Sequence, residues 1–171
     1  MINEQQKMET KLTTYLQITT DLENVFAKFD ALYIEKQVAY YLEKYNAIKM
    51  FWKNNFSIQK GICYQSLYEV AGGKGMHEKL YGVGLDRVNS DAVKDAKAVI
   101  KSRNAKMAKK LEEAGITKII KSNIELNGDG FNGYYSVETN NGNKVITIDT
   151  ILAGGYNIQR LHYRTLVKIS K

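Results

Sequence analysis

Apolar residues recur at every third or fourth position along the first part of the chain. From about Glu4 to Tyr33 they form one stripe, and polar residues fill most of the remaining positions. The members of this stripe are Met8, Leu12, Tyr15, Leu22, Phe26, Phe29 and Tyr33, with Thr19 in one polar gap. This spacing predicts a long amphipathic helix.

A second stripe follows the first with a shifted phase, so we expect a bend or a new helix near Ile34 to Gln37. Its members are Ile34, Val38, Tyr41, Tyr45, Ile48 and Trp52. The chain contains no proline, the residue that interrupts helices most strongly. We therefore expect long helices whose stripes are buried either in an antiparallel hairpin or in a dimerising coiled coil.

The next region is expected to hold a short helix, a loop and a longer helix. Ser57 is a suitable cap for the short helix, which should end where Gly72 and Gly73 interrupt it. Glycine is frequent from Gly72 to Asn89, which is typical of a loop or hinge. The longer helix is predicted to begin at Asn89 or Ser90 and to end before Gly115. Its apolar stripe consists of Val93, Ala96, Ile100, Met107 and Leu111, with Asn104 in the seam.

From Lys118 onward the apolar residues alternate with polar ones, which predicts strands. The candidate strands are Lys118 to Leu126, Phe131 to Thr139, Lys144 to Ala153 and Tyr156 to Ile169. Asn141 and Gly142 both tolerate positive φ, so they indicate a tight hairpin.

The sequence therefore predicts an α+β fold, in which N-terminal long helices are followed by a helix and a C-terminal antiparallel β-meander of three to four strands. We expect the helices to pack on one face of the sheet. Residues 1–88 are interpreted as a helical arm or helical subdomain with a glycine-rich loop. Residues 89–171 are interpreted as a domain made of a helix and the antiparallel sheet.

Lysine and arginine number 25 against 18 acidic residues, which gives a net charge of +7. The excess is concentrated in the longer predicted helix, where Asp95 is the acid facing a run of cations. These cations are Lys94, Lys97, Lys101, Arg103, Lys106, Lys109 and Lys110. Such a run favours a polyanionic partner. The alternative, that these are ordinary solvent-exposed helix residues, stays open.

The last candidate strand carries a second basic row. In an extended chain the side chains alternate between faces, and Leu161, Tyr163, Val167 and Ile169 then form a core-facing row. The opposite row contains Tyr156, Ile158, Arg160, His162, Arg164 and Lys168. Arginine binds phosphate, and tyrosine and histidine stack on bases. This row predicts a recognition face, unless acids such as Asp149 and Glu138 neutralise the arginines across the strands.

The predicted ligand-binding residues are thus Tyr156, Arg160, His162, Arg164, Lys94, Lys97, Lys101 and Lys109. No catalytic or metal-binding motif accompanies them. The glycines at Gly72–Gly75 lack the spacing of a P-loop, and Arg87 stands where a dinucleotide-binding fingerprint needs glycine. His77, His162 and Cys63 occur at no recognised ligand spacing, and Cys63 is better interpreted as a small buried hydrophobe. We expect a non-enzymatic protein without cofactor or metal.

The location of the protein is expected to be the cytoplasm. No apolar run approaches the ~20 residues that a membrane-spanning helix needs. The polar N-terminus lacks the features of a secretory signal, and a single cysteine agrees with a reducing compartment. We expect no membrane association, and we expect a homo-oligomer formed through the N-terminal helices.

The segment GGYNIQRLHYRTLVK, Gly154 to Lys168, resembles the C-terminal segment of small bacteriophage accessory proteins. The preceding GDGFNGYYSVET, Gly128 to Thr139, is similar to the strand that goes with it. The resemblance implies a phage or prophage origin and a role in the cytoplasm of an infected bacterium.

We therefore expect an accessory protein that binds nucleic acid or a host nucleoprotein complex, for example as an inhibitor of a host defence complex. One alternative is a protein that sequesters a small cyclic nucleotide signal. A second alternative is a structural or oligomerisation protein.

Overall fold

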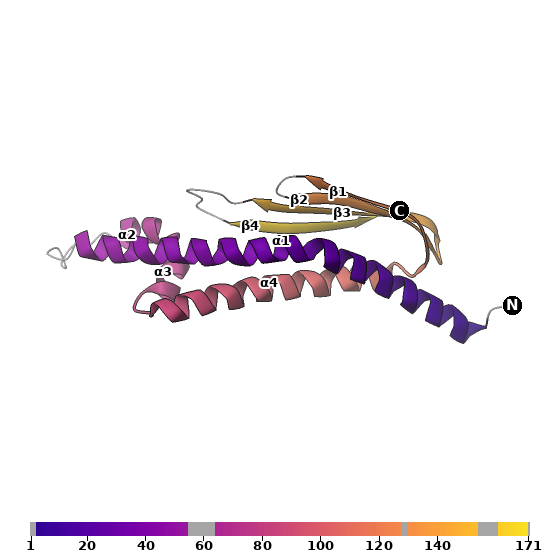
Figure 1. Ribbon diagram of the computed structural model, residues 1–171, viewed down its shortest axis with the longest axis horizontal. Helices are drawn as coiled ribbons and strands as arrows, with labels where there is room; N and C mark the ends of the chain where they lie inside the picture. The colour runs from indigo at the N-terminus through magenta and orange to yellow at the C-terminus, as the bar shows by residue number, and fades with distance from the viewer. Residues whose placement is uncertain (1–2, 55–63, 128–129, 154–160, 171) are drawn as a thin grey trace. The chain divides into compact units, whose positions relative to one another are not determined.

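The computed structural model describes residues 3–54, 64–127, 130–153 and 161–170 (Figure 1). Its helices are α1 (Glu4–Asn54), α2 (Tyr64–Ala71), α3 (Lys74–Leu80) and α4 (Leu85–Glu113). Its strands are β1 (Ile116–Asn127), β2 (Gly130–Thr139), β3 (Gly142–Ala153) and β4 (His162–Ile169). The strands form one antiparallel sheet in the order β1-β2-β3-β4. The predicted α+β fold, with helices first and an antiparallel meander at the C-terminus, is confirmed.

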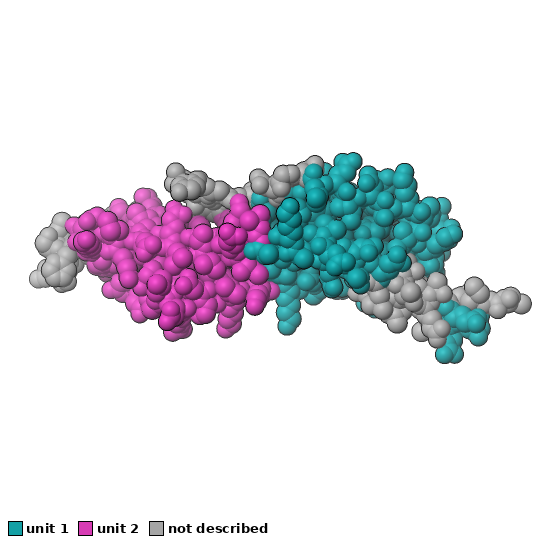
Figure 2. Space-filling view, in the orientation of Figure 1, with its two compact units in different colours: residues 1–31, 99–153, 162–171 teal, residues 32–98, 154–161 magenta. Residues whose placement is uncertain are grey.

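The chain folds into two compact units, which Figure 2 shows in different colours. Unit 1 comprises Met1–Ala31, Val99–Ala153 and His162–Lys171, and unit 2 comprises Leu32–Ala98 and Gly154–Leu161. Helices α1 and α4 each contribute one end to each unit. Because the units are built from interleaved segments, their boundary does not coincide with the predicted division between residues 88 and 89.

In unit 1 the helices cover one face of the sheet. The helical side of this core consists of Ile18, Leu22, Phe26 and Phe29 of α1 and Met107 and Leu111 of α4. The strand side consists of Ile116, Phe131, Tyr135, Val137, Ile146, Ile148 and Val167. The Phe131 ring lies edge-on to Phe26 at 4.9 Å and contacts Phe29 at 5.5 Å. One face of the sheet is therefore buried, and alternate residues of each strand lie on the other face.

Unit 2 has a separate core that is formed by helices alone. Its buried members are Tyr41, Tyr45, Ile48, Leu67, Ala71, Leu80, Val88 and Ala92. They come from the second half of α1, from α2 and α3, and from the start of α4. None of the helices in the described part of the chain is both long enough and apolar enough to cross a membrane.

Helix α1 continues without a break through Ile34 to Gln37, so of the two predicted alternatives, a bend or a new helix, the new helix is wrong. The apolar stripe changes phase because the two halves of the helix pack into different cores. Its buried positions up to Phe29 belong to the core of unit 1, and those from Tyr41 onward belong to the core of unit 2. The predicted stripe also omitted Ile18, which is fully buried. The side chains of Met8, Leu12 and Tyr15 lie outside the described part.

The stretch from Gly72 to Asn89 is mostly helical, so the prediction of a loop there is wrong. It contains α3 and the first residues of α4. Tertiary packing outweighs the low helix propensity of glycine, because Leu80 and Val88 are buried in the core of unit 2. Gly73 and Gly82 lie at the helix ends, where their φ angles of +123° and +76° favour glycine. Ser57, the predicted cap of the preceding helix, lies outside the described residues.

The hairpin between β2 and β3 turns over Asn140 and Asn141, and Gly142 follows with a φ of +96°. The Thr139 hydroxyl donates a hydrogen bond to the Gly142 carbonyl at 2.8 Å and accepts one from the Asn141 N–H at 3.1 Å. These contacts satisfy polar groups of the turn locally. The tight hairpin predicted at this position is confirmed.

Candidate functional site

The last strand places alternate side chains on opposite faces of the sheet. Tyr163 and Val167 pack against the core of unit 1. Arg164, Leu166 and Lys168 alternate with them, so they lie on the outer face, and all three are exposed. The extended conformation predicted for this segment is confirmed for His162–Ile169.

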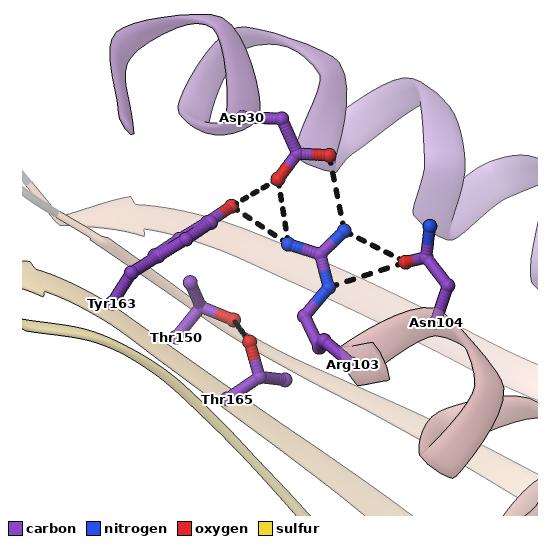
Figure 3. Close-up of polar contacts among 6 residues, drawn as sticks. All are labelled: Asp30, Arg103, Asn104, Thr150, Tyr163 and Thr165. Carbon is purple, nitrogen blue, oxygen red and sulfur yellow. Dashed lines mark hydrogen bonds and ion pairs between the residues drawn. The ribbon is translucent and has the colours of Figure 1, made fainter. Parts of the chain in front are cut away.

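A hydrogen-bonded ion pair connects β4 to both helices of unit 1 (Figure 3). Arg103 of α4 binds Asp30 of α1 through two hydrogen bonds, Nη1 to Oδ1 at 2.6 Å and Nη2 to Oδ2 at 3.0 Å. The Tyr163 hydroxyl donates to the same carboxylate and accepts a hydrogen bond from Arg103 at 2.8 Å. Asn104 accepts two further hydrogen bonds from Arg103, at 2.8 and 3.2 Å.

This network is largely shielded from solvent. The side chains of Arg103 and Asp30 are 11% and 19% exposed, and the guanidinium carbon of Arg103 lies 3.9 Å from the centroid of the Phe26 ring. Burial, reinforced by the hydrogen bond to Asp30, raises the pKa of Tyr163 well above its ordinary value. Tyr163 therefore keeps its proton at neutral pH and remains a donor. We conclude that the network has a structural role, which is to hold β4 against the helices.

A cross-strand hydrogen bond lies beside this network. Thr150 of β3 and Thr165 of β4 are in register, and their hydroxyl oxygens are 3.1 Å apart (Figure 3). Thr150 is only 1% exposed, so this hydrogen bond satisfies a buried polar group. The inner face of β4 is thus fixed both by packing and by hydrogen bonds.

The outer face of the sheet combines cations with apolar and aromatic side chains. Lys168 lies in the same cross-strand row as Tyr134 of β2. Arg164 is opposite Ile151, which is 58% exposed. Leu166, which is 49% exposed, lies between the two cations. Arg164 and Lys168 are four residues apart, so their Cα atoms are separated by about 13 Å along the strand.

The two acids that could have neutralised this row are not its direct cross-strand partners. Asp149 is in register with Leu166, and Glu138 is in register with Lys118 and Asn143. Asp149 is diagonal to both Arg164 and Lys168, so it lowers the local positive potential. Within the described residues, however, neither cation forms an ion pair.

Two cations of the α4 run are occupied in structural contacts. Arg103 binds Asp30, as described above. Lys110 donates a hydrogen bond from Nζ to the carbonyl oxygen of Val167 at 2.9 Å. Arg103 therefore does not contribute to an open cationic surface, although the sequence placed it in one. Lys110 is exposed, but its ammonium group is held at the edge of the sheet.

Asp95, the acid in the same run, is bound by residues from other helices of unit 2. It accepts hydrogen bonds from Lys79 at 2.7 Å and from the Tyr41 hydroxyl at 2.6 Å. Burial would raise the pKa of Asp95, but these two hydrogen bonds outweigh burial and lower the pKa below its ordinary value. Burial and the hydrogen bond to Asp95 raise the pKa of Tyr41 to about 12.

The four lysines of α4 that were predicted to bind a ligand are all exposed. Lys94 and Lys97 belong to unit 2, and Lys101 and Lys109 belong to unit 1. In unit 1, α4 contacts the inner face of the sheet, whereas Arg164 lies on the outer face. The fold therefore does not join Lys101 and Lys109 with Arg164 in one continuous surface.

The remaining predicted site residues are placed only in part. His162 is the first residue of β4 and is half-buried opposite Ala153. Tyr156 and Arg160 lie outside the described residues. The contacts of Asp30, Arg103 and Tyr163 were missed at the sequence level. The available signals were Asn104 in the seam of α4 and Tyr163 in the core-facing row, since both place a polar group where it needs a buried partner.

In the described part of the chain, no group of three or more His, Cys, Asp or Glu side chains could hold a metal ion. Comparison of the chain with protein-family models, curated proteins and solved structures finds no match. We therefore infer function from the residues of the site alone.

Proposed function

We propose that this protein is a non-enzymatic bacteriophage accessory protein that binds single-stranded nucleic acid through the outer face of its sheet. The observation that supports the proposal is the arrangement of Arg164 and Lys168. Both cations are exposed on either side of Leu166 and form no ion pair within the described residues. The phage origin rests on the resemblance carried by Gly154 to Lys168.

Single strands suit this surface better than a duplex does. An open sheet can take unstacked bases on aromatic and apolar side chains, while cations bind the phosphates. The aromatic and apolar side chains of this surface are Tyr134, Ile151 and Leu166. Its cations are Arg164 and Lys168. Asp149 is in register with Leu166, which lies between the two cations. We therefore expect a short contact of modest affinity rather than a long row of phosphate contacts.

By analogy with other small phage proteins, we propose that the bound strand belongs to a host nucleoprotein complex. Occupying the nucleic acid of a host defence complex would give the protein an anti-defence role. This step is an analogy at the level of protein class, and it carries no residue assignment.

The test is a fluorescence anisotropy titration with labelled single-stranded DNA and RNA at low and physiological salt. The double variant Arg164→Gln/Lys168→Gln should bind about tenfold more weakly at low salt. It should also reduce the slope of log affinity against log salt by about 1.4, because two phosphate contacts are lost from a single strand.

The matched control is Lys101→Gln/Lys109→Gln, which removes the same charge from the exposed face of α4 in unit 1. This variant should change the affinity about twofold or less, since only the general potential of the protein falls. An equal loss of affinity in the two double variants would overturn the assignment of nucleic-acid binding to the outer face of the sheet. Absence of binding by the unsubstituted protein at low salt would overturn nucleic-acid binding itself.

A further inference from the structure

Unit 2 contains a cavity of 480 Å³ between the last turns of α1 and the segment that follows α3. Tyr45, Lys49 and Trp52 line it from α1, and Tyr81 lines it from the other side. The other lining residues that the structure describes are glycine or aliphatic. A volume of this size is typical of pockets that bury a small organic ligand, and such pockets are mostly apolar with a few polar groups.

Two aromatic rings of the lining, Trp52 and Tyr81, contact each other. The centroids of Trp52 and Tyr81 are 5.6 Å apart, and their planes are inclined by 38°. His77 stacks on Tyr81 with 5.0 Å between centroids and 19° between planes. Tyr81 remains 53% exposed despite these contacts. A ring that is held by neighbours and still open to solvent is a suitable stacking surface for a flat ligand.

The charged group among the described lining residues is a cation, Lys49. The Lys49 ammonium lies 4.5 Å from the centroid of the Tyr45 ring, so a cation–π contact holds it beside the cavity. No acidic side chain lines the cavity in the described part of the chain, and Lys49 forms no ion pair there. The cavity therefore favours a ligand with a negative group.

We propose that this cavity is a binding site for a free mononucleotide. A planar base would stack on Tyr81 and Trp52, and the phosphate would pair with Lys49. The two aromatic rings, the cation and the volume are all needed for this assignment, because each alone fits many ligands. The site uses none of the residues that the sequence assigned to nucleotide binding, and it is independent of the proposed contact between the sheet and nucleic acid.

Trp52 is the single tryptophan of the chain, so its fluorescence reports directly on this cavity. Excitation at the red edge of the indole band avoids absorption by tyrosine and by nucleobases. Titration with adenosine 5′-monophosphate should give a saturable change in emission. Adenosine should bind about tenfold more weakly because it lacks the charge-assisted contact, and inorganic phosphate alone should give no change.

Variants separate the charge from the stacking surface. Lys49→Gln should weaken binding of adenosine 5′-monophosphate about tenfold and leave adenosine unchanged. Lys53→Gln is the matched control, because Lys53 is an exposed lysine one turn further along α1 that does not line the cavity. It should leave both affinities unchanged. No saturable change with the unsubstituted protein, or equal effects of Lys49→Gln on the two ligands, would overturn the proposal.

The stacking surface is tested with Tyr81→Leu, which keeps an apolar side chain but removes the ring. Because Tyr81 is more than half exposed, this variant should fold, and thermal unfolding followed by circular dichroism tests whether it does. Both adenosine 5′-monophosphate and adenosine should then bind more weakly. Unchanged affinity in the folded variant would contradict the assigned stacking.

Discussion

Arg103 and Asp30 form an ion pair through two hydrogen bonds of 2.6 and 3.0 Å. Their side chains are only 11% and 19% exposed. The carboxylate of this pair also accepts a hydrogen bond from the Tyr163 hydroxyl. Tyr163 immediately precedes Arg164, so anchoring the tyrosine inward directs the arginine outward. A shift of β4 by one residue would exchange the two faces. The buried network therefore fixes the orientation of the proposed binding face.

Asp30→Ala should strongly destabilise unit 1. It leaves the Arg103 charge without its partner in a mostly buried site, which should lower the free energy of unfolding by about 3 kcal/mol. The matched variant Tyr163→Phe removes only the third member of the network and should cost about 1 kcal/mol. Urea denaturation measures both. If Asp30→Ala cost no more than Tyr163→Phe, the ion pair would not be the main contribution of the network.

Gly130 should tolerate no side chain, because its backbone is too close to the neighbouring strand. A Cβ atom at this position would lie 2.0 Å from the Thr150 carbonyl oxygen, which belongs to the backbone of β3 and cannot move aside alone. We expect Gly130→Ala to lower the free energy of unfolding by about 3 kcal/mol through overpacking.

The control for Gly130 is Gly142→Ala at the opposite end of the same strand pair. Gly142 has open space around an added Cβ, but its φ is +96°. The cost there is backbone strain of about 1 kcal/mol. Comparison of the two variants by urea denaturation separates steric overlap from backbone strain, and equal costs would contradict the close approach at Gly130.

The strands were predictable from the sequence because their alternation is a local property. Phe131, Tyr135 and Val137 alternate with polar residues, and the same residues are buried in the structure. Helix α3 was not predictable from its local sequence, since glycine lowers helix propensity there and the contacts that stabilise the helix come from distant residues. Leu80 of α3, for example, is buried in a core shared with Tyr41 and Ile48 of α1.

In the candidate site, too, some features follow from the local sequence and others depend on distant contacts. The outward orientation of Arg164 follows from alternation once Val167 and Tyr163 are recognised as core-facing. The removal of Arg103 from the cationic surface does not follow from any local pattern, because its partner Asp30 lies 73 residues away in the sequence. The sequence thus predicted a basic helix, but only the fold shows which of its cations remain accessible to a ligand.

Asp95 should make the stability of unit 2 depend on pH. Its pKa is lowered, because the hydrogen bonds from Lys79 and Tyr41 outweigh the opposing effect of burial. A carboxyl group with a lowered pKa stabilises the folded state above its unfolded pKa, near 3.8, and this contribution is lost as the pH falls through the folded pKa. Asp95→Asn should therefore be less stable than the unsubstituted protein at neutral pH, and the difference should disappear in acid.

Asp95→Asn should lower the free energy of unfolding by about 1 kcal/mol or less at neutral pH. The Lys79 and Asp95 side chains are 41% and 36% exposed, so solvent screens the pair. Urea denaturation over a range of pH measures the difference. Asp91→Asn is the control, since the ion pair of Asp91 within the described residues is a long one, 3.7 Å, to the highly exposed Arg87 on the same helix. An equal dependence on pH in both variants would contradict a specific role for Asp95.

Lys110 should protect the free edge of the sheet. Strand β4 is an edge strand, and the Lys110 ammonium binds the Val167 carbonyl at 2.9 Å. Lys110→Ala should lower the free energy of unfolding by about 1 kcal/mol and should promote concentration-dependent self-association, since an uncovered edge can pair with a second strand. Lys109→Ala removes the same charge from the adjacent exposed position and should do neither. Urea denaturation and light scattering at several concentrations distinguish the two variants, and equal self-association would mean that lost charge, rather than the uncovered carbonyl, is the cause.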